Sequence, residues 1–376
     1  MDEALTTRIA PSRGSSGTRL PSIDGWRAIS ILLVLGTHCP WAEGFPRSWE
    51  PIFKWLFDGN LGVRFFFIIS GFLITYLMIA ESEREGSVNL KHFYLRRAFR
   101  ILPVYFAFLG VLFLLQIFTP FRQSALAWGG CLTFTRDFID GTQADLQISR
   151  HLWSLSVEEQ FYLLWPCVFS LMHKMKLKHC LWWAIVFPIC FSPIFRVVDH
   201  WRSYPAFLNP LFANFSFFKY FDSIAVGCGG ALLFARYRDQ IKRFLIADSR
   251  VIEGVSIALI LVPYLLDHLM VARFVTIPFG PTMQAFGFST LLLKSLIMPH
   301  ARVYRALNYP FVRTLGVLSY SIYIWQQIFW TRPLEFGLES VWWMSFPGML
   351  VSSIGVAAFS YVCLERPFIK WRACFR

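Results

Sequence analysis

The 376-residue sequence predicts an all-α polytopic membrane protein, a bundle of about ten transmembrane helices with both termini in the cytoplasm. Composition is the first indication, because 56% of the residues are hydrophobic, the mean hydropathy is +0.49 and only 16% are charged. Soluble domains carry about a quarter charged residues. The second indication is the alternation of long apolar runs with short basic segments, which divides the chain into spans and connections.

The net charge of +13 is compatible with nucleic-acid binding, so the positions of the basic residues decide its meaning. Lys and Arg lie mainly in the connections. With the first segment inside, the inner connections hold roughly three times as many basic residues as the outer ones, which is the bias of cytoplasmic loops. Because topology accounts for the charge, we predict a lipid bilayer environment and no nucleic-acid partner.

The first elements are a tail and a span that carries a histidine. Residues 1–22 are rich in Ser, Thr, Gly, Pro and Arg and predict a flexible cytoplasmic tail without the apolar core of a signal peptide. The first span is expected at about 26–40. As a helix it separates Arg27 from His38 by roughly 16 Å, placing Arg27 at the inner face and His38 about halfway across or beyond. An ionisable group at that depth indicates a function; the alternative is a histidine hydrogen-bonded within the bundle.

The second and third spans flank a basic connection. The second is expected at 61–79, where Ser70 and Gly71 predict the close approach of another helix. Residues 80–100 are basic and predict a cytoplasmic loop that leads directly into the third span, at 101–118.

An outer loop and the remaining spans complete the domain. Residues 119–150 predict this loop, and their apolar middle, 125–134, is too short to span and is expected to be interfacial or re-entrant. The fourth span begins within 151–166. The other spans are expected at about 181–197, 215–234, 251–270, 278–298, 315–330 and 342–364. Residues 23–366 would then form the transmembrane domain, followed by a cytoplasmic tail at 367–376.

Cysteine spacing predicts no metal site. The eight cysteines form no CxxC pair and no Cys/His pattern with metal-ligand spacing, and most lie in or beside apolar spans. They are expected to be small core residues.

Six blocks of sequence carry a resemblance to a known family. In chain order they are RLPSIDGWRAISILLVLGTHC, GVRFFFIISGFLITYL, FYLRRAFRILPVYF, HLWSLSVEEQFYLLWP, LGVLSYSIYIWQQ and LERPFIKW. Together they resemble the successive signatures of the acyltransferase family 3 membrane proteins. The resemblance implies a bacterial inner-membrane enzyme that moves an acyl group, commonly acetyl, from cytoplasmic acyl-CoA to a hydroxyl. The acceptor would be a carbohydrate, a lipid-linked glycan or a small natural product.

The resemblance also implies roles for two residues. The family motif pairs a basic residue with a histidine at the spacing of Arg27 and His38. Arg27 is therefore expected on the donor side, and His38 as the catalytic base or a transient acyl carrier. The chain departs from the family at Arg64, where an acid is usual, at Tyr220, where a base is usual, and at Gln326, where a histidine is usual.

Two further sites follow from the chemistry of acyl transfer. A histidine base works best beside a carboxylate, and we favour Glu158 over Glu159 because Ser154 lies four residues earlier on the same helical face. The alternative is an interfacial acidic pair. Arg97 and Arg100 share a face at i, i+3, where guanidinium groups suit the phosphates of coenzyme A. The alternative for Arg97 and Arg100 is a basic cluster that only keeps this segment on the cytoplasmic side of the membrane.

The sequence therefore predicts a membrane O-acyltransferase that uses acyl-CoA, most simply acetyl-CoA, and a carbohydrate acceptor such as a cell-surface polysaccharide or a lipid-linked glycan. A transporter or flippase with a His38 and Glu158 proton relay is the alternative from another class. A membrane scaffold is a third.

Overall fold

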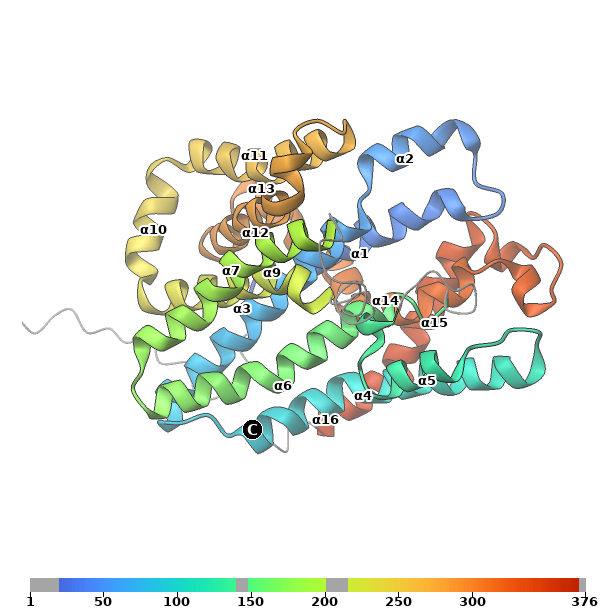
Figure 1. The fold of residues 1–376 in the computed structure, drawn as a ribbon, viewed down its shortest axis with the longest axis horizontal. Coiled ribbons are helices and arrows are strands. Elements are labelled where there is room, and N and C mark those ends of the chain that lie inside the picture. The colour runs from blue at the N-terminus through green and yellow to red at the C-terminus, as the bar shows by residue number, and fades with distance from the viewer. Residues whose placement is uncertain (1–19, 140–147, 201–215, 372–376) are drawn as a thin grey trace, which may run out of the picture.

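The structure, a computed structural model, describes residues 20–139, 148–200 and 216–371 (Figure 1). Every regular element within these ranges is a helix, so the all-α prediction is confirmed. Most of the two expected tails, and the loop residues 140–147, lie outside the described residues.

Each predicted span coincides with a helix, but the loop expected at 80–100 is wrong, because only residues 86–89 lie between α3 and α4. The helices at the predicted spans are α1 (Ile23–His38), α3 (Gly59–Glu85), α4 (Leu90–Phe118), α6 (Leu152–Lys174), α7 (Lys178–His200), α9 (Ser216–Arg236), α11 (Ser249–His268), α12 (Arg273–Ile297), α14 (Pro310–Trp330) and α15 (Gly348–Ser360). A π-helical turn, Tyr361–Glu365, continues α15 into α16 (Arg366–Trp371). Shorter helices lie in the connections: α2 (Glu50–Leu56), α5 (Ala125–Leu132), α10 (Arg238–Ala247) and α13 (Arg302–Arg305).

Six of the helical segments are long and apolar enough to cross a membrane, which makes this a multi-pass membrane protein. They contain α3, α4, α7, α9, α11 and α15 with α16. The helices α1, α6, α12 and α14 are not among them. Helix α1 is only 16 residues long, and α6 carries Glu158 and Glu159 within its length. A polar helix is tolerated in a bilayer when neighbouring helices cover it, and α12 is buried along most of its length.

Hydrogen bonds tie several helix ends together at one end of the bundle, which we call the Arg27 end. There the Ser22 backbone N–H, just before α1, donates to Asn308 Oδ1 at 2.9 Å, just before α14. Lys294, near the end of α12, forms an ion pair of 2.9 Å with Glu253, near the start of α11. The Ser22 hydroxyl also donates to the Ser295 carbonyl in α12 at 3.2 Å. The start of α1 therefore lies beside the end of α12 and the start of α14.

The opposite helix ends meet at what we call the His38 end. The backbone N–H of Phe346, before α15, donates to the carbonyl of Glu43, after α1, at 2.8 Å. The Tyr264 hydroxyl, near the end of α11, donates to the Trp55 carbonyl in α2 at 2.8 Å. These contacts place the starts of α1, α11 and α14 at the Arg27 end and the start of α15 at the His38 end, so α14 and α15 run in opposite directions.

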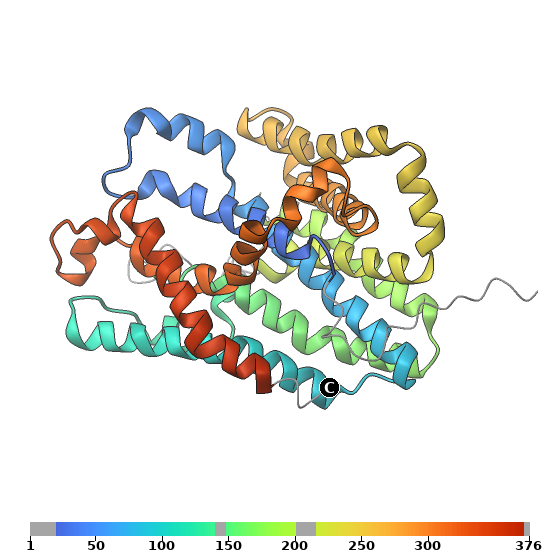
Figure 2. The ribbon, with the colours of Figure 1, turned by 180° about the vertical axis from the view of Figure 1, so that it is seen from behind.

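The last helix crosses the back of the bundle. Figure 2 shows α15 and α16 running diagonally and ending beside the start of α4. At this meeting point the rings of Phe368 and Phe99 stack with centroids 6.1 Å apart. The C-terminal helix therefore covers the element that carries Arg97 and Arg100.

Two glycines set the distance between α3 and α9. A Cβ on Gly71 would lie 2.2 Å from the Ile224 carbonyl oxygen, and one on Gly227 would lie 2.2 Å from the Ile68 carbonyl oxygen. Both contacts are far shorter than real Cβ atoms make, so the backbones touch at glycine on both sides. The close approach predicted at Ser70 and Gly71 is confirmed.

Candidate active site

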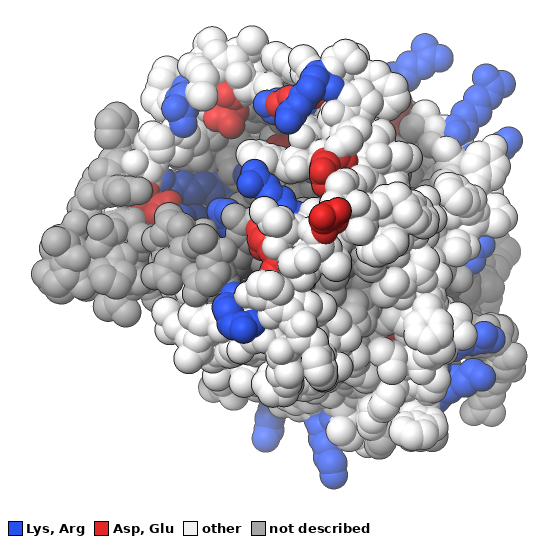
Figure 3. Space-filling view, turned by 90° about the vertical axis from the view of Figure 1, so that its right-hand side faces the viewer, with Lys and Arg blue, Asp and Glu red and all other residues white. Residues whose placement is uncertain are grey.

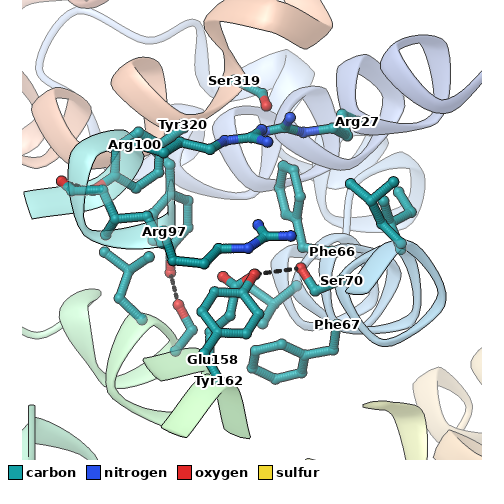
Figure 4. A pocket seen from close by; sticks show the side chains of 17 residues that line it. Arg27, Phe66, Phe67, Ser70, Arg97, Arg100, Glu158, Tyr162, Ser319 and Tyr320 are labelled. Carbon is teal, nitrogen blue, oxygen red and sulfur yellow. Dashed lines mark hydrogen bonds between the residues drawn. The ribbon is translucent and has the colours of Figure 1, made fainter. Parts of the chain in front are cut away.

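Three arginines line one pocket toward the Arg27 end, and we call it the arginine pocket. Arg27 comes from α1, and Arg97 and Arg100 come from α4. Figure 4 shows the three side chains pointing into the same space, with Glu158 of α6 across from them. The pocket has a volume of about 80 Å³, which suits a small group or a narrow chain rather than a whole nucleotide. Its other polar lining residues are Ser70, Ser154, Tyr162, Ser319, Tyr320 and Tyr323.

The charges of these arginines are not neutralised in pairs. Among the described residues, none of the three guanidinium groups has a hydrogen-bond or ion-pair partner within the usual distances. Arg97 lies over the ring of Tyr162, with 5.0 Å from Cζ to the ring centroid. A cation stacked on a ring keeps its N–H groups available at its edge. The pocket is therefore equipped to bind an anion.

Arg96 contrasts with its neighbour. Its Nη2 forms an ion pair of 2.7 Å with Glu81 at the end of α3, and it does not line the arginine pocket. The i, i+3 pair predicted from the helical period, Arg97 and Arg100, is the pair that faces the pocket. Arg96 instead connects the start of α4 to α3.

Glu158 is the member of the acidic pair that faces the pocket. Its carboxylate accepts hydrogen bonds from the hydroxyls of Ser70 and Tyr162, and the Tyr162 hydroxyl also lies 3.1 Å from Ser70 Oγ. Glu159 does not line the pocket, and its buried Oε1 has no hydrogen-bond partner in the described part of the chain. The side of α6 predicted from Ser154 is therefore the side that the structure turns toward the arginines.

His38 lies in a second and larger space, which we call the histidine cavity. The cavity has a volume of about 400 Å³ and lies at the His38 end. Nδ1 of His38 is buried and has no hydrogen-bond partner among the described residues. The ring packs edge-on against Trp330, with 5.7 Å between the ring centroids. Figure 3 looks onto this end of the molecule and shows a hollow with charged side chains in and around it.

The structure does not bring Glu158 to His38. No hydrogen bond or ion pair joins them in the described chain, and they line different pockets. The reason is depth: Glu158 lies six residues, or roughly 9 Å, along α6 from Leu152, whereas His38 is the last residue of α1. Val63 and Tyr323 line both spaces, so the two pockets adjoin there.

His151 and Tyr323 are site residues that the sequence reasoning missed. The ring of His151 lines the histidine cavity and lies between two backbone carbonyls, with Nδ1 3.0 Å from Ile148 O and Nε2 3.2 Å from Ile324 O. A neutral imidazole has one N–H and donates to only one of them. Tyr323 donates to the His151 carbonyl at 2.9 Å. The position of His151 at the head of the HLWSLS block was the available signal.

Two departures from the family pattern lie against each other. The Arg64 guanidinium lies over the ring of Tyr220, with 5.7 Å from Cζ to the ring centroid. Arg64 occupies the position where an acid is usual in the family, and Tyr220 the position where a base is usual, so a cation–aromatic contact replaces an acid and a base. Lys219 does not replace that base, since it forms an ion pair of 2.6 Å with Asp199. Gln326 is buried, and its amide atoms make no hydrogen bond to any residue that the structure describes.

The described residues contain no group of three or more His, Cys, Asp or Glu side chains arranged to hold a metal ion.

Residues 20–365 match a family model described as "Acyltransferase domain". No solved structure matches the chain at a significant level.

Curated relatives are similar along most of this chain. The peptidoglycan O-acetyltransferase OatA of Listeria monocytogenes is 23% identical over 369 residues, which cover 93% of this chain and 56% of the relative. The O-acetyltransferase OatA of Staphylococcus aureus is 27% identical over 330 residues, covering 81% of this chain and 50% of the relative. The chain thus spans about half the length of the curated relatives it matches. Because the family model covers nearly the whole chain, the protein belongs to the acyltransferase family.

Proposed function

We propose that this protein is an O-acetyltransferase of the bacterial inner membrane. It moves an acetyl group from cytoplasmic acetyl-CoA to a hydroxyl of a cell-surface polysaccharide or a lipid-linked glycan. The observation that carries the proposal is the adjacency of two unlike spaces, a small pocket with three unpaired arginines and a large cavity that contains His38. They suit an anionic donor and a bulky acceptor, respectively.

The arginine pocket is the donor site in this proposal. Coenzyme A is a polyanion, and guanidinium groups bind phosphate oxygens bidentately. The volume of about 80 Å³ excludes the adenosine part, so phosphate groups or the pantetheine arm enter while the nucleotide stays outside. Apolar side chains such as Phe66 and Phe67 line the same pocket and suit the arm. The arm would extend past Val63 and Tyr323 toward His38.

His38 acts as the base in this proposal. It takes the proton of the acceptor hydroxyl while the acceptor oxygen bonds to the acetyl carbon. The carbon–sulfur bond of the thioester breaks, and the leaving sulfur of coenzyme A receives the proton from His38. Since no carboxylate lines the histidine cavity in the described chain, the imidazole performs this step without the Glu158 partner expected from sequence. A transient acetyl group on His38 is the second route.

The proposed topology has ten spans with both termini in the cytoplasm. The acyltransferase domain occupies residues 23–366, between tails at 1–22 and 367–376. The basic connections support this orientation. The Arg27 end is then cytoplasmic, where acetyl-CoA is present, and the His38 end faces outward.

The acceptor class rests on the histidine cavity and on the relatives. Two of the relatives are named as O-acetyltransferases, and one of these names specifies peptidoglycan, a glycan polymer. A cavity of about 400 Å³ with tryptophans in its wall is large enough for sugar units.

The test uses the full chain in proteoliposomes. Acetyl-CoA is supplied on the Arg27 side and glycan oligosaccharides on the other, and free thiol and acetylated glycan are measured together. Glycan-dependent thiol release with one acetyl ester formed per thiol supports the proposal. Glycan movement across the membrane without thiol release would instead make the protein a transporter or flippase. Transfer with acetyl-CoA supplied only on the His38 side would reverse the orientation.

A further inference from the structure

The wall of the histidine cavity is unusually aromatic for a site that opens to solvent. Trp41, Trp153 and Trp330 line it together with Tyr323. Trp41 is 78% exposed, so the face of its indole ring is available to a ligand. Flat aromatic faces offer the apolar C–H faces of a sugar ring a rigid contact surface at low entropic cost.

Two polar atoms in the same wall lack partners. Thr37 Oγ1 and His38 Nδ1 are buried, and neither makes a hydrogen bond to another described residue. Buried polar groups are nearly always satisfied, so each exception needs an explanation. Asn60 and Gln327 also line the cavity and add amide groups. A ligand with several hydroxyls would satisfy this arrangement.

One cation stands at the cavity without an acidic counterpart. Of the described residues that line it, Arg150 is the one Lys or Arg, and none is Asp or Glu. The Arg150 side chain is exposed, and among the described residues it has no hydrogen-bond or ion-pair partner. An unpaired guanidinium on a cavity wall attracts a carboxylate or phosphate, which it binds with two parallel N–H groups.

We propose that the histidine cavity binds an anionic saccharide, with a sugar ring on the tryptophan faces and the carboxylate or phosphate of the glycan on Arg150. Arg150 is then a specificity residue that orients the glycan so that one hydroxyl faces His38. This inference rests on the proposed function for the identity of the reaction. The cavity itself is a binding site that is testable without turnover.

The experiment measures binding of three probes to the full chain in nanodiscs by isothermal titration calorimetry, without acyl-CoA. The probes are a neutral N-acetylhexosamine oligosaccharide, the same oligosaccharide bearing carboxylates, and the same oligosaccharide bearing a terminal phosphate. We expect one of the two anionic probes to bind about tenfold more tightly than the neutral one. The anionic probe that binds more tightly than the neutral one identifies the charged group of the glycan.

The variant Arg150→Gln is expected to remove the anionic preference while leaving the affinity for the neutral probe unchanged. Arg150→Lys is expected to restore part of it, because the point charge remains without the planar fork. Arg332→Gln is the matched control and should behave as the native protein. Arg332 is exposed near the same end of the molecule and does not line the cavity. Trp41→Ala should weaken binding of all three probes by a similar factor.

Equal binding of the neutral and anionic probes to the native chain would overturn the proposal. So would a preference that survives in Arg150→Gln. Failure of the proposed function gives a different result. If binding is selective and depends on Arg150 but no thiol is released from acetyl-CoA, the saccharide site is supported and acetyl-CoA is rejected as the donor.

Discussion

At the residue scale, His38 and Glu158 lie in different pockets, so the histidine has no carboxylate beside it in the described chain. His38 is the last residue of α1, and its Nδ1 has no hydrogen-bond partner among the described residues. One carboxylate oxygen of Glu158 accepts hydrogen bonds from both Ser70 and Tyr162. Glu158 is therefore placed to balance the charge of the arginine pocket rather than to orient the imidazole. Its proposed catalytic contribution is then indirect, through the position of the donor.

Replacing His38 by Ala is expected to reduce acetyl transfer by about 10²–10⁴-fold, because a general base contributes about that much. Little packing is lost, so the amount of protein in the membrane should not change. The measurement is glycan-dependent thiol release, normalised to membrane abundance. Turnover above a few per cent of the native value would rule out His38 as base or acyl carrier.

The two glutamates offer a matched comparison. Glu158→Gln should lower kcat, because the hydroxyls of Ser70 and Tyr162 lose the carboxylate to which they donate. It should lower rather than raise the KM for the anionic donor, because the pocket keeps its three cations. Glu159→Gln should be close to silent in KM, since Glu159 does not line the pocket. Steady-state kinetics of both variants check this. The reverse pattern would show that the wrong member of the pair has been placed in the site.

Arg97 and Arg100 can be separated from a role in topology. Replacing either by Ala should raise the KM for acetyl-CoA, and replacing both by Lys should rescue it only in part, because Lys lacks the fork that binds phosphate bidentately. Arg96→Ala, on the Glu81 ion pair, is the control and should leave KM unchanged. Full rescue by Lys, or Ala variants with lower membrane abundance and native KM, would favour a role in topology.

At the scale of elements, the contact between α3 and α9 fixes the position of Ser70. Gly71→Ala should lower the melting temperature, because its Cβ would overlap the Ile224 carbonyl at 2.2 Å and overpacking costs about 1–3 kcal/mol. Gly110→Ala in α4 meets nothing within 4 Å and should be neutral or slightly stabilising. Thermal unfolding in the same detergent compares the two. Equal melting temperatures would mean that the helices separate at no cost.

At the scale of the whole molecule, the topology predicts which surfaces an impermeant thiol reagent reaches. In a background without native cysteines, single cysteines at Ser48 and Ser340 should be labelled from outside intact cells. Cysteines at Ser87 and Asp239 should be labelled only after permeabilisation. All four native residues are exposed in the structure. A reversal at any one of them would contradict the ten-span arrangement.

Much of the fold was predictable because a bilayer imposes a length on every apolar run. The ten predicted spans coincide with helices to within a few residues at most boundaries. The largest difference is at α4, which begins at Leu90 rather than near 101. Two smaller ones are at α3, which ends at Glu85 rather than near 79, and at α15, which begins at Gly348 rather than near 342. In α4 the Asn89 side chain caps the helix by accepting from the His92 N–H at 3.0 Å, so the basic segment is already helical. A hydropathy profile does not register such caps.

The sequence by itself determined where the helices lie, which side of α6 carries Ser154 and Glu158, and that Arg97 and Arg100 share a face. Each of these depends on helical period and apolar length, which are local properties of the chain. Only the tertiary structure decided that Arg27 joins the two α4 arginines and Glu158 in one pocket, while His38 lies in another with His151. The period of a helix specifies angles about its own axis. Its depth and rotation against its neighbours come from contacts such as Gly71 with Ile224, between residues far apart in the chain.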